Sequence, residues 1–309
     1  MKKFRVYVTA LLTLSSPLSA LNSFAASGPG TTGAEFLKVG VGARPLAMGS
    51  AFVALPDDAN AINWNPGALG EIKQKSVSAS YNALFQDQNQ GFLAYAMPLN
   101  NDMGVVGLGV NYLIISKIEK RAGDTEAADS TFSNQNYAIS ASYGKASVAQ
   151  GLSLGGNIKY IHEKLDTFSG SAVAADLGAL YRTPIENLST GLAVQNLGSK
   201  IGPDKLPLLA KAGMVYQMFD KSLSLALDGD WLAMNKRGYL DFGAEYWIQN
   251  ALALRVGYQL GRGQDHLGKV VGLGAGIGLK FDMFNMDYAF LPFGDLGNTH
   301  RITLGFKFE

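Results

Sequence analysis

The sequence predicts an all-β protein: a transmembrane antiparallel β-barrel of about 14 strands, preceded by an N-terminal plug or hatch segment. Three observations support this fold class. From residue 74 onward, runs of about ten residues alternate apolar and polar side chains, as a strand with two different faces does. The first residues have the pattern of a secretory signal peptide. The connections between the runs are alternately short and long.

The chain begins with a segment typical of exported proteins. Basic residues precede the apolar stretch 6–21, and small residues at positions 23 and 25 mark a cleavage site. The alternative is an uncleaved membrane anchor, which the short apolar core and Pro17 disfavour. We therefore predict three parts: a signal peptide at 1–25, a plug or hatch segment at 26–73 and an outer-membrane barrel at 74–309.

Composition excludes several classes of protein. The chain has no cysteine, which excludes a disulfide framework and thiol chemistry. Its 26 Lys and Arg residues nearly balance its 25 Asp and Glu residues, so nothing indicates a nucleic-acid partner. No stretch after the signal peptide is long and apolar enough for a transmembrane helix, which leaves an exported soluble protein or a barrel.

Each alternating run predicts one strand. In the run 251–261, Leu252 and Leu254 share one face, whereas Ala253 and Arg255 share the other. A soluble barrel with its apolar face inside produces the same alternation, so the period alone does not orient the faces. The predicted strands are 75–83, 91–99, 103–116, 135–145, 152–164, 171–183, 190–196, 206–218, 222–231, 238–248, 251–262, 270–281, 284–290 and 299–308.

The connections and the aromatic residues favour the membrane-spanning arrangement. Short links are 219–221, 249–250 and 282–283, and longer ones are 117–134, 197–205, 263–269 and 291–298. Short periplasmic turns and long outer loops are typical of outer-membrane barrels. Tyrosine, tryptophan and phenylalanine residues near strand ends are expected to form two interfacial girdles. We therefore predict a protein of the bacterial cell outer membrane, surrounded by outer-membrane lipid.

Residues 26–73 lack the two-residue period and contain short, glycine-hinged elements instead. A barrel of about fourteen strands has a lumen wider than its own side chains fill, and this segment is the candidate occupant. The residues that we assign to the plug motif are Gly42, Ala43, Arg44, Met48, Gly49, Asp57, Asp58, Asn63, Trp64, Asn65 and Pro66.

Several of these residues have alternative roles. We expect Arg44 to pair with an inward carboxylate and so to anchor the plug, with ligand contact as the alternative. The candidate partners are Asp176, Asp228 and Glu245. Asp57 or Asp58 is expected to cap a short helix that Pro66 ends, with cation binding as the alternative. Trp64 is expected to pack the plug onto the wall, with a grip on a hydrophobic ligand as the alternative.

The strings 41–44, 47–54, 57–61 and 63–66 resemble the N-terminal signature of the PorV/PorQ family. That family is similar to the FadL type of hydrophobic-solute channels, whose plug carries an Asn-Pro-Ala element; here Gly67 replaces the alanine. The resemblance implies a fourteen-stranded barrel with a hatch. It also implies protein export, because members in type IX secretion systems hold secreted cargo and pass it to the surface-anchoring machinery.

Two classes of function follow. In the first, outer loops such as 117–134 bind secreted cargo proteins or secretion-system components. In the second, the barrel passes hydrophobic small molecules along apolar plug residues. Those residues are Phe36, Leu37, Leu46, Met48 and Phe52. The inferred inward positions are strongly polar, which favours the first class.

Signals for catalysis are weak. The three histidines, His162, His266 and His300, have neither metal-ligand spacing nor an evident serine partner, although Ser171 or Ser140 is a candidate. We therefore predict no enzyme activity, no catalytic residue, no cofactor and no metal.

Overall fold

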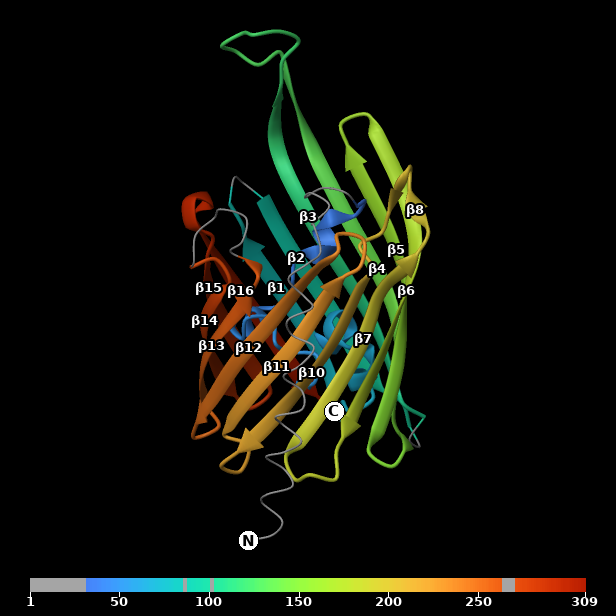
Figure 1. Cartoon of the computed structure of the whole chain (residues 1–309), viewed down its shortest axis with the longest axis vertical. Coiled ribbons are helices and arrows are strands. Elements are labelled where there is room, and N and C mark those ends of the chain that lie inside the picture. The colour runs from blue at the N-terminus through green and yellow to red at the C-terminus, as the bar shows by residue number, and fades with distance from the viewer. Residues whose placement is uncertain (1–31, 86–87, 101–102, 263–269) are drawn as a thin grey trace.

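The computed structural model describes residues 32–85, 88–100, 103–262 and 270–309 (Figure 1). The predicted signal peptide at 1–25, the first residues of the predicted plug and the predicted loop 263–269 lie outside the described residues. No helix in the described ranges has the length and apolar character needed to cross a bilayer.

Fourteen strands of the described chain form one closed antiparallel barrel, in which each strand pairs with its neighbour and β1 pairs with β16. The barrel strands are β1 (Lys75–Ala83), β2 (Gln88–Pro98), β3 (Val105–Lys120), β4 (Ser130–Ala149), β5 (Leu152–Leu165), β6 (Phe168–Arg182), β7 (Leu188–Gly198), β10 (Leu209–Met218), β11 (Leu223–Leu232), β12 (Arg237–Ile248), β13 (Leu252–Leu260), β14 (Leu273–Phe281), β15 (Phe284–Pro292) and β16 (Asn298–Phe308). The predicted antiparallel barrel and its strand number are confirmed, and the plug role of the segment before it stays a prediction.

The apolar faces of the strands point outward. On β13, Leu254 and Val256 are 46% and 52% exposed, whereas the alternating Ala253 and Arg255 are 0% and 5% exposed. Leu93, Leu108, Ile158 and Leu304 repeat this outward exposure on other strands. An outer surface of this kind needs hydrocarbon around it, which is the arrangement of a membrane barrel. The two-residue period of the sequence did not show whether the apolar faces point into or out of the barrel, and the structure shows that they point out.

Strand boundaries differ from the predicted ones mainly at one hairpin. After a bulge at Lys117, whose φ is 57°, pairing resumes from Ile118 with Phe132 to Lys120 with Ser130. The predicted loop 117–134 is therefore shorter, because both strands continue beyond the apolar belt. This hairpin projects past the rest of the barrel (Figure 1). The predicted loop 197–205 contains a second small hairpin, β8 (Lys200–Ile201) with β9 (Asp204–Lys205).

The short links are tight turns with left-handed backbone. Gln249 and Asn250 have φ of 51° and 54°. Two consecutive positive φ values match the twist of a hairpin, which is why two residues suffice here. We refer to this end of the barrel as the short-turn end. At the other end, η5 (Gly294–Leu296) lies in the connection between β15 and β16.

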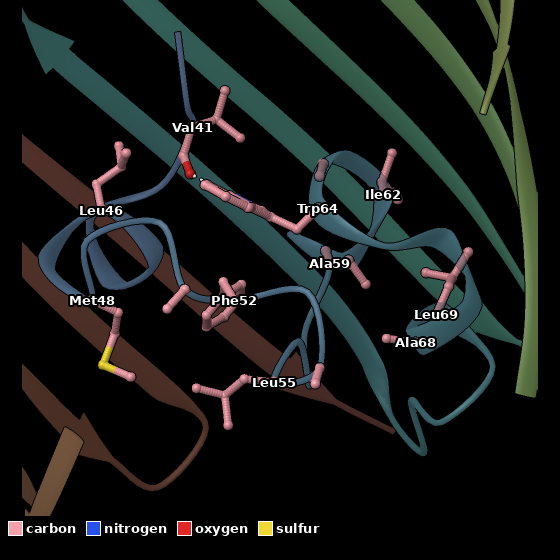
Figure 2. Close-up of a cluster of buried hydrophobic side chains, with 14 of the residues drawn as sticks. Val41, Leu46, Met48, Phe52, Leu55, Ala59, Ile62, Trp64, Ala68 and Leu69 are labelled. Atoms are coloured by element: carbon pink, nitrogen blue, oxygen red, sulfur yellow. Dashed lines mark hydrogen bonds between the residues drawn. The ribbon is translucent and has the colours of Figure 1, made fainter. Parts of the chain in front are cut away.

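Residues 32–73, termed the inner segment, contact the inner faces of opposite walls. Their elements are η3 (Glu35–Lys38), α2 (Ala43–Ala47), α3 (Ala61–Trp64) and α4 (Pro66–Leu69). Helix α2 packs against β13 to β16, whereas α4 packs against β3 to β7. Between the helices, buried side chains that include Leu46, Phe52 and Trp64 form the main apolar cluster (Figure 2).

Wall glycines make room for this segment. A Cβ on Gly155 would lie 2.0 Å from the Pro66 carbonyl oxygen, and one on Gly178 would lie 2.2 Å from Asn65 Oδ1. On the opposite wall, a Cβ on Gly257 would lie 2.0 Å from the Met48 carbonyl carbon. Glycines on the inward strand faces therefore permit close approach of backbone to backbone.

Candidate functional site in the barrel interior

Arg44 joins the inner segment to the barrel wall. Its Nε donates to Glu245 Oε2 at 2.7 Å and its Nη2 donates to Glu245 Oε1 at 2.8 Å. Its Nη1 also donates to Asp57 Oδ1 at 2.6 Å. Paired donation to both carboxylate oxygens is the strong arrangement for a guanidinium. Of the three carboxylates considered from the sequence, Glu245 is therefore the partner of Arg44.

Glu245, the wall residue of this pair, also forms an ion pair with Arg255 of the wall. Arg255 Nε donates to Glu245 Oε2 at 2.6 Å, and Arg255 Nη1 donates to Asp287 Oδ1 at 2.7 Å. A Cβ on Gly278 would lie 2.4 Å from Arg255 Nη1, so the guanidinium occupies space that a side chain would fill. Strands β12, β13 and β15 are thus tied to the inner segment through one network.

The prediction that Asp57 or Asp58 caps the helix that ends before Pro66 is wrong. The N-cap residue of α3 is Asn60, and its side chain makes no capping bond. Asp58 Oδ1 instead accepts from Asn60 N at 2.8 Å, in a turn that precedes the helix. Asp57 is drawn to Arg44. Partial removal from water would raise the pKa of the half-exposed Asp57 carboxyl, but the positive charges of Arg44 and Lys307 outweigh this effect and lower its pKa to about 2.

A charged cavity of about 390 Å³ lies beside the Arg44 network at the short-turn end. Asp57, Arg255 and Lys307 line it, together with Asp282 and Met283 from the turn between β14 and β15. Lys307 Nζ donates to the Asp57 carbonyl oxygen at 3.1 Å. This cavity is polar, as the inward positions of the sequence predict.

The other two candidate carboxylates have different partners. Asp228 Oδ2 accepts from the amides of Phe52 at 2.6 Å and Val53 at 2.7 Å, and so fixes the middle of the inner segment. Asp176 pairs with Lys159 at 2.8 Å and lies where the β6–β7 register shifts. Both residues therefore hold backbone or wall in place.

The Asn65-Pro66 element begins α4 against the wall. Asn65 Nδ2 donates to the carbonyl oxygens of Val53 at 2.7 Å and Ala179 at 3.0 Å. Its Oδ1 accepts from Gly67 N and caps the helix, and Pro66 occupies the first helical position, where no amide donor is needed. The predicted end of a helix before Pro66 is confirmed, since α3 ends at Trp64.

Of the remaining motif residues, Gly42 lies near Asn60 and Pro45 of the inner segment, and the others contact the wall. Gly42 and Gly49 have φ of 82° and 64°, which glycine adopts without strain. Ala43 N donates to Thr303 Oγ1 at 2.8 Å, and Met48 packs against Gly243. The Asn63 carbonyl oxygen accepts from Gln195 Nε2 at 2.6 Å. Asn157 Nδ2 likewise donates to the Ile62 carbonyl oxygen at 2.6 Å. The sequence alone did not identify the wall residues Thr303, Asn157 and Gln195, although their inward polar positions on strands were an available signal.

Trp64 lies between the inner segment and a second cavity. Its Nε1 donates to the Val41 carbonyl oxygen at 3.0 Å (Figure 2), and its ring meets Phe52 edge-on at 5.9 Å. Lys211 Nζ lies 4.8 Å from the centre of the Trp64 ring. The cavity has a volume of about 150 Å³. Its lining includes Leu37, Trp64, Leu209, Lys211, Asp230, Leu232, Tyr239, Gln259 and Arg262.

A separate group of apolar side chains, termed the outer apolar cluster, lies near the long-loop end. Its buried members are Ala34, Phe36, Leu113, Ala138, Ile161, Ala172, Ala174, Ile201 and Leu206. These apolar side chains share the inner wall of β3 to β6 with buried polar ones such as Asn136 and Lys159. Leu37 packs against this cluster and also lines the 150 Å³ cavity, so the two regions are adjacent.

Strand pairing between β5 and β6 places one histidine beside a serine. His162 Nδ1 and Ser171 Oγ lie 2.9 Å apart as cross-strand partners, and the Tyr160 hydroxyl also lies 2.9 Å from Ser171 Oγ. All three side chains are on the outward face of β5 and β6. Sequence spacing alone did not reveal this pair, because residues nine positions apart meet only through strand register. No enzyme activity is assigned to it.

No protein-family model and no curated protein matches the sequence. The fold is similar to that of a deltaS2S3 mutant of the TodX monoaromatic hydrocarbon channel, with a TM-score of 0.61 and 12% identity over 87% of this chain and 98% of that one. It is also similar to the Ralstonia pickettii toluene transporter TbuX, with a TM-score of 0.59 and 14% identity over 87% and 99% of the two chains.

A Pseudomonas aeruginosa FadL homologue gives a TM-score of 0.56 at 12% identity, over 84% of this chain and 96% of that one. Identities this low show a common fold alone. None of these three is described as a PorV or PorQ protein, so that resemblance stays a prediction. With its apolar outer surface and this fold, the chain is a closed fourteen-stranded β-barrel of the bacterial outer membrane.

Proposed function

We propose that this protein passes hydrophobic small molecules across the outer membrane, with the inner segment acting as its plug. The observation that carries the proposal is the outer apolar cluster, which continues through Leu37 into the 150 Å³ cavity. These side chains are buried beneath the inner segment, and once that segment moves they would offer little to a polar solute and much to a hydrophobic one. The fold shared with channels described for toluene and monoaromatic hydrocarbons supports the same class of solute.

The plug role rests on the wall contacts of the inner segment. Arg44 bonds to Glu245 on one wall, and Asn65 bonds to Ala179 on another. The segment also separates the 150 Å³ cavity, which borders Leu37, from the 390 Å³ cavity at the short-turn end. Passage therefore requires part of this segment to move.

Uptake of radiolabelled toluene by cells that express the protein tests the proposal. Leu209→Trp fills the 150 Å³ cavity and should lower the initial rate several-fold. Leu225→Trp, on the lipid-facing side of the neighbouring strand, is the matched control and should leave the rate unchanged. Uptake no faster than in cells without the protein would contradict the proposed function.

Protein export of the PorV/PorQ type is the second candidate. The projecting β3–β4 hairpin favours it, because its loop is held in one shape: Arg121 donates to the carbonyl oxygens of Thr125 and Glu126. A photo-crosslinking residue at Thr125 in intact cells should then capture secreted proteins or partner barrels. Capture of the same species from Gly202, on the separate β8–β9 hairpin, would indicate nonspecific contact instead.

A further inference from the structure

The outward faces of β4, β5 and β6 change from apolar to polar toward the long-loop end. Along β5, Ile158 and Tyr160 point outward and are 66% and 44% exposed. The next two side chains on that face belong to His162 and Lys164. An apolar band that ends at aromatic residues marks the boundary between hydrocarbon and lipid headgroups, and long connections lie on the outer side of such barrels. His162 and Lys164 therefore lie at the headgroup level of the outer leaflet.

Strand pairing surrounds these two residues with hydroxyl and amide groups. Ser171 on β6 is the partner of His162, and Ser169 is the partner of Lys164. On the other side, Gln135 on β4 also pairs with Lys164. These five residues are termed the interfacial patch. Alternate residues of a strand lie about 7 Å apart and neighbouring strands about 5 Å apart, so one ligand group can contact several of them.

The charge of the interfacial patch comes from Lys164, which is exposed. Among the residues that the structure describes, Lys164 forms no ion pair. Its neighbour Glu163 points into the barrel, where it lies beside the Ala34 amide. In the connections beyond the patch, Lys120 already pairs with Asp166. Lys164 therefore offers a positive charge and three hydrogen-bond donors to a group outside the protein.

His162 adds a directed donor to the patch. Ser171 Oγ lies 2.9 Å from both the Tyr160 hydroxyl and His162 Nδ1. When Tyr160 donates to Ser171 and Ser171 donates to Nδ1, the proton of the neutral imidazole is on Nε2. This Nε2 lies 3.4 Å from Ser169 Oγ, which is long for a hydrogen bond, so a closer anionic acceptor can replace that contact. The Tyr137 ring packs beside the imidazole at 5.0 Å between centres.

An apolar groove of about 440 Å³ lies on the same three strands, toward the short-turn end. Its outward-facing lining residues are Ala141, Tyr143, Gly156, Ile158, Ala175 and Leu177. Gly156 and the two alanines leave space between the larger side chains. The groove begins at Ile158, which is four residues, or about 13 Å, from His162 along β5. A narrow apolar groove within the lipid-facing belt fits an acyl chain.

We propose that the interfacial patch binds the phosphate group of an outer-leaflet lipid, while an acyl chain of the same lipid lies in the 440 Å³ groove. The Lys164 ammonium and the His162 Nε2 donate to the phosphate oxygens, and the Ser169 hydroxyl completes the contact. Charge complementarity selects the headgroup, and the groove on the same strands makes a lipid the occupant rather than free phosphate. The inference is independent of the proposed function.

The test measures binding of three probes to the purified, detergent-solubilised protein by native mass spectrometry. Dioleoyl phosphatidic acid has the phosphate and the chains, dioleoylglycerol has the chains alone, and inorganic phosphate has neither chain. We expect phosphatidic acid to bind about tenfold or more tightly than dioleoylglycerol, because hydrogen bonds to a charged group have an effect of that size. Equal binding of the two lipids, or binding of neither, would overturn the inference. Inorganic phosphate that displaces phosphatidic acid at equal concentration would show a free-phosphate site and would also overturn it.

Two pairs of variants test the residues of the patch. Lys164→Gln should lower the binding of phosphatidic acid about tenfold and leave dioleoylglycerol within about twofold of the parent. Lys236→Gln, in the exposed β11–β12 loop at the same end, removes the same charge and should change neither. His162→Ala should weaken phosphatidic acid binding several-fold. His300→Ala is its control, because that exposed histidine pairs with Ala83 and Phe290 instead of serines.

The groove has its own matched pair. Ala141→Leu fills the groove and should weaken the binding of both lipids, whereas Ala79→Leu, on the outward face of β1, should not. Equal effects within any of these pairs would show a general change in charge or surface rather than a site, and would overturn the inference. All the substituted side chains except that of His162 are exposed, and the comparison of probes on the parent protein decides the question if a variant does not fold.

Discussion

Arg44 donates two hydrogen bonds to Glu245, from Nε to Oε2 at 2.7 Å and from Nη2 to Oε1 at 2.8 Å. This pair links the inner segment to β12. Because the Glu245 carboxylate is 1% exposed, its charge depends on Arg44 and Arg255 rather than on water. Removing one partner of a buried pair leaves an uncompensated charge, whereas removing both does not. This asymmetry gives the first prediction.

Glu245→Gln should destabilise the folded protein by about 3–5 kcal/mol, because two buried guanidinium groups lose their shared carboxylate. The double variant Arg44→Met with Glu245→Leu should be less destabilised than the sum of its single variants. The free energy of unfolding in urea, followed by tryptophan fluorescence, checks both values. A double variant as unstable as that sum would show that the two residues do not act as a pair.

A methyl group on a wall glycine should displace the inner segment. Gly155→Ala places its Cβ 2.0 Å from the Pro66 carbonyl oxygen, so we expect a loss of about 1–3 kcal/mol. Gly123→Ala is the control, because nothing lies within 4 Å of its Cβ position. Limited proteolysis provides the second measurement, because residues 32–73 should be cleaved faster in Gly155→Ala than in Gly123→Ala. Equal cleavage rates in the two variants would contradict the close packing of α4 against the wall.

Asp228 should determine the stability of the chain at Phe52 and Val53. Asp228→Ala leaves both amides buried without an acceptor, at about 1–3 kcal/mol for each group. Asp228→Asn retains one acceptor oxygen and should restore part of the loss. Hydrogen exchange of the two amides reports this directly, and unchanged exchange rates in the alanine variant would contradict the assignment.

A charged side chain on the outward face of β13 should destabilise the barrel in the membrane. Leu254→Arg puts a guanidinium in the lipid-facing belt, where the cost near the bilayer midplane is about 2–4 kcal/mol. Ala127→Arg, in the exposed β3–β4 loop, should have almost no effect. Folding into phospholipid vesicles, measured by the shifted mobility of unheated samples on a gel, compares the two. Equal folding yields would mean that Leu254 does not face lipid.

Short stretches of the sequence are enough to predict many of the strands of this barrel. The run 251–261 alternates, and Leu252–Leu260 is a strand. The pairing of Arg44 with an inward carboxylate was also predictable, because a buried guanidinium needs a counter-charge. The choice of Glu245 over Asp176 or Asp228 was not, since that choice depends on where α2 meets the wall.

The tertiary structure decided which way the strands face. A period of two is the same whether the apolar side is inside or outside. The signal peptide and the connections predicted the membrane-spanning arrangement, and the closed barrel shows Leu254 outside and Arg255 inside. Register brought Ser171 to His162 and placed Asp228 beside Asp241. The outer apolar cluster likewise joins Phe36 to Ile161 and Ile201. Such contacts link residues far apart in the chain, and local sequence preferences carry no information about them, because they depend on the shear and curvature of the closed sheet.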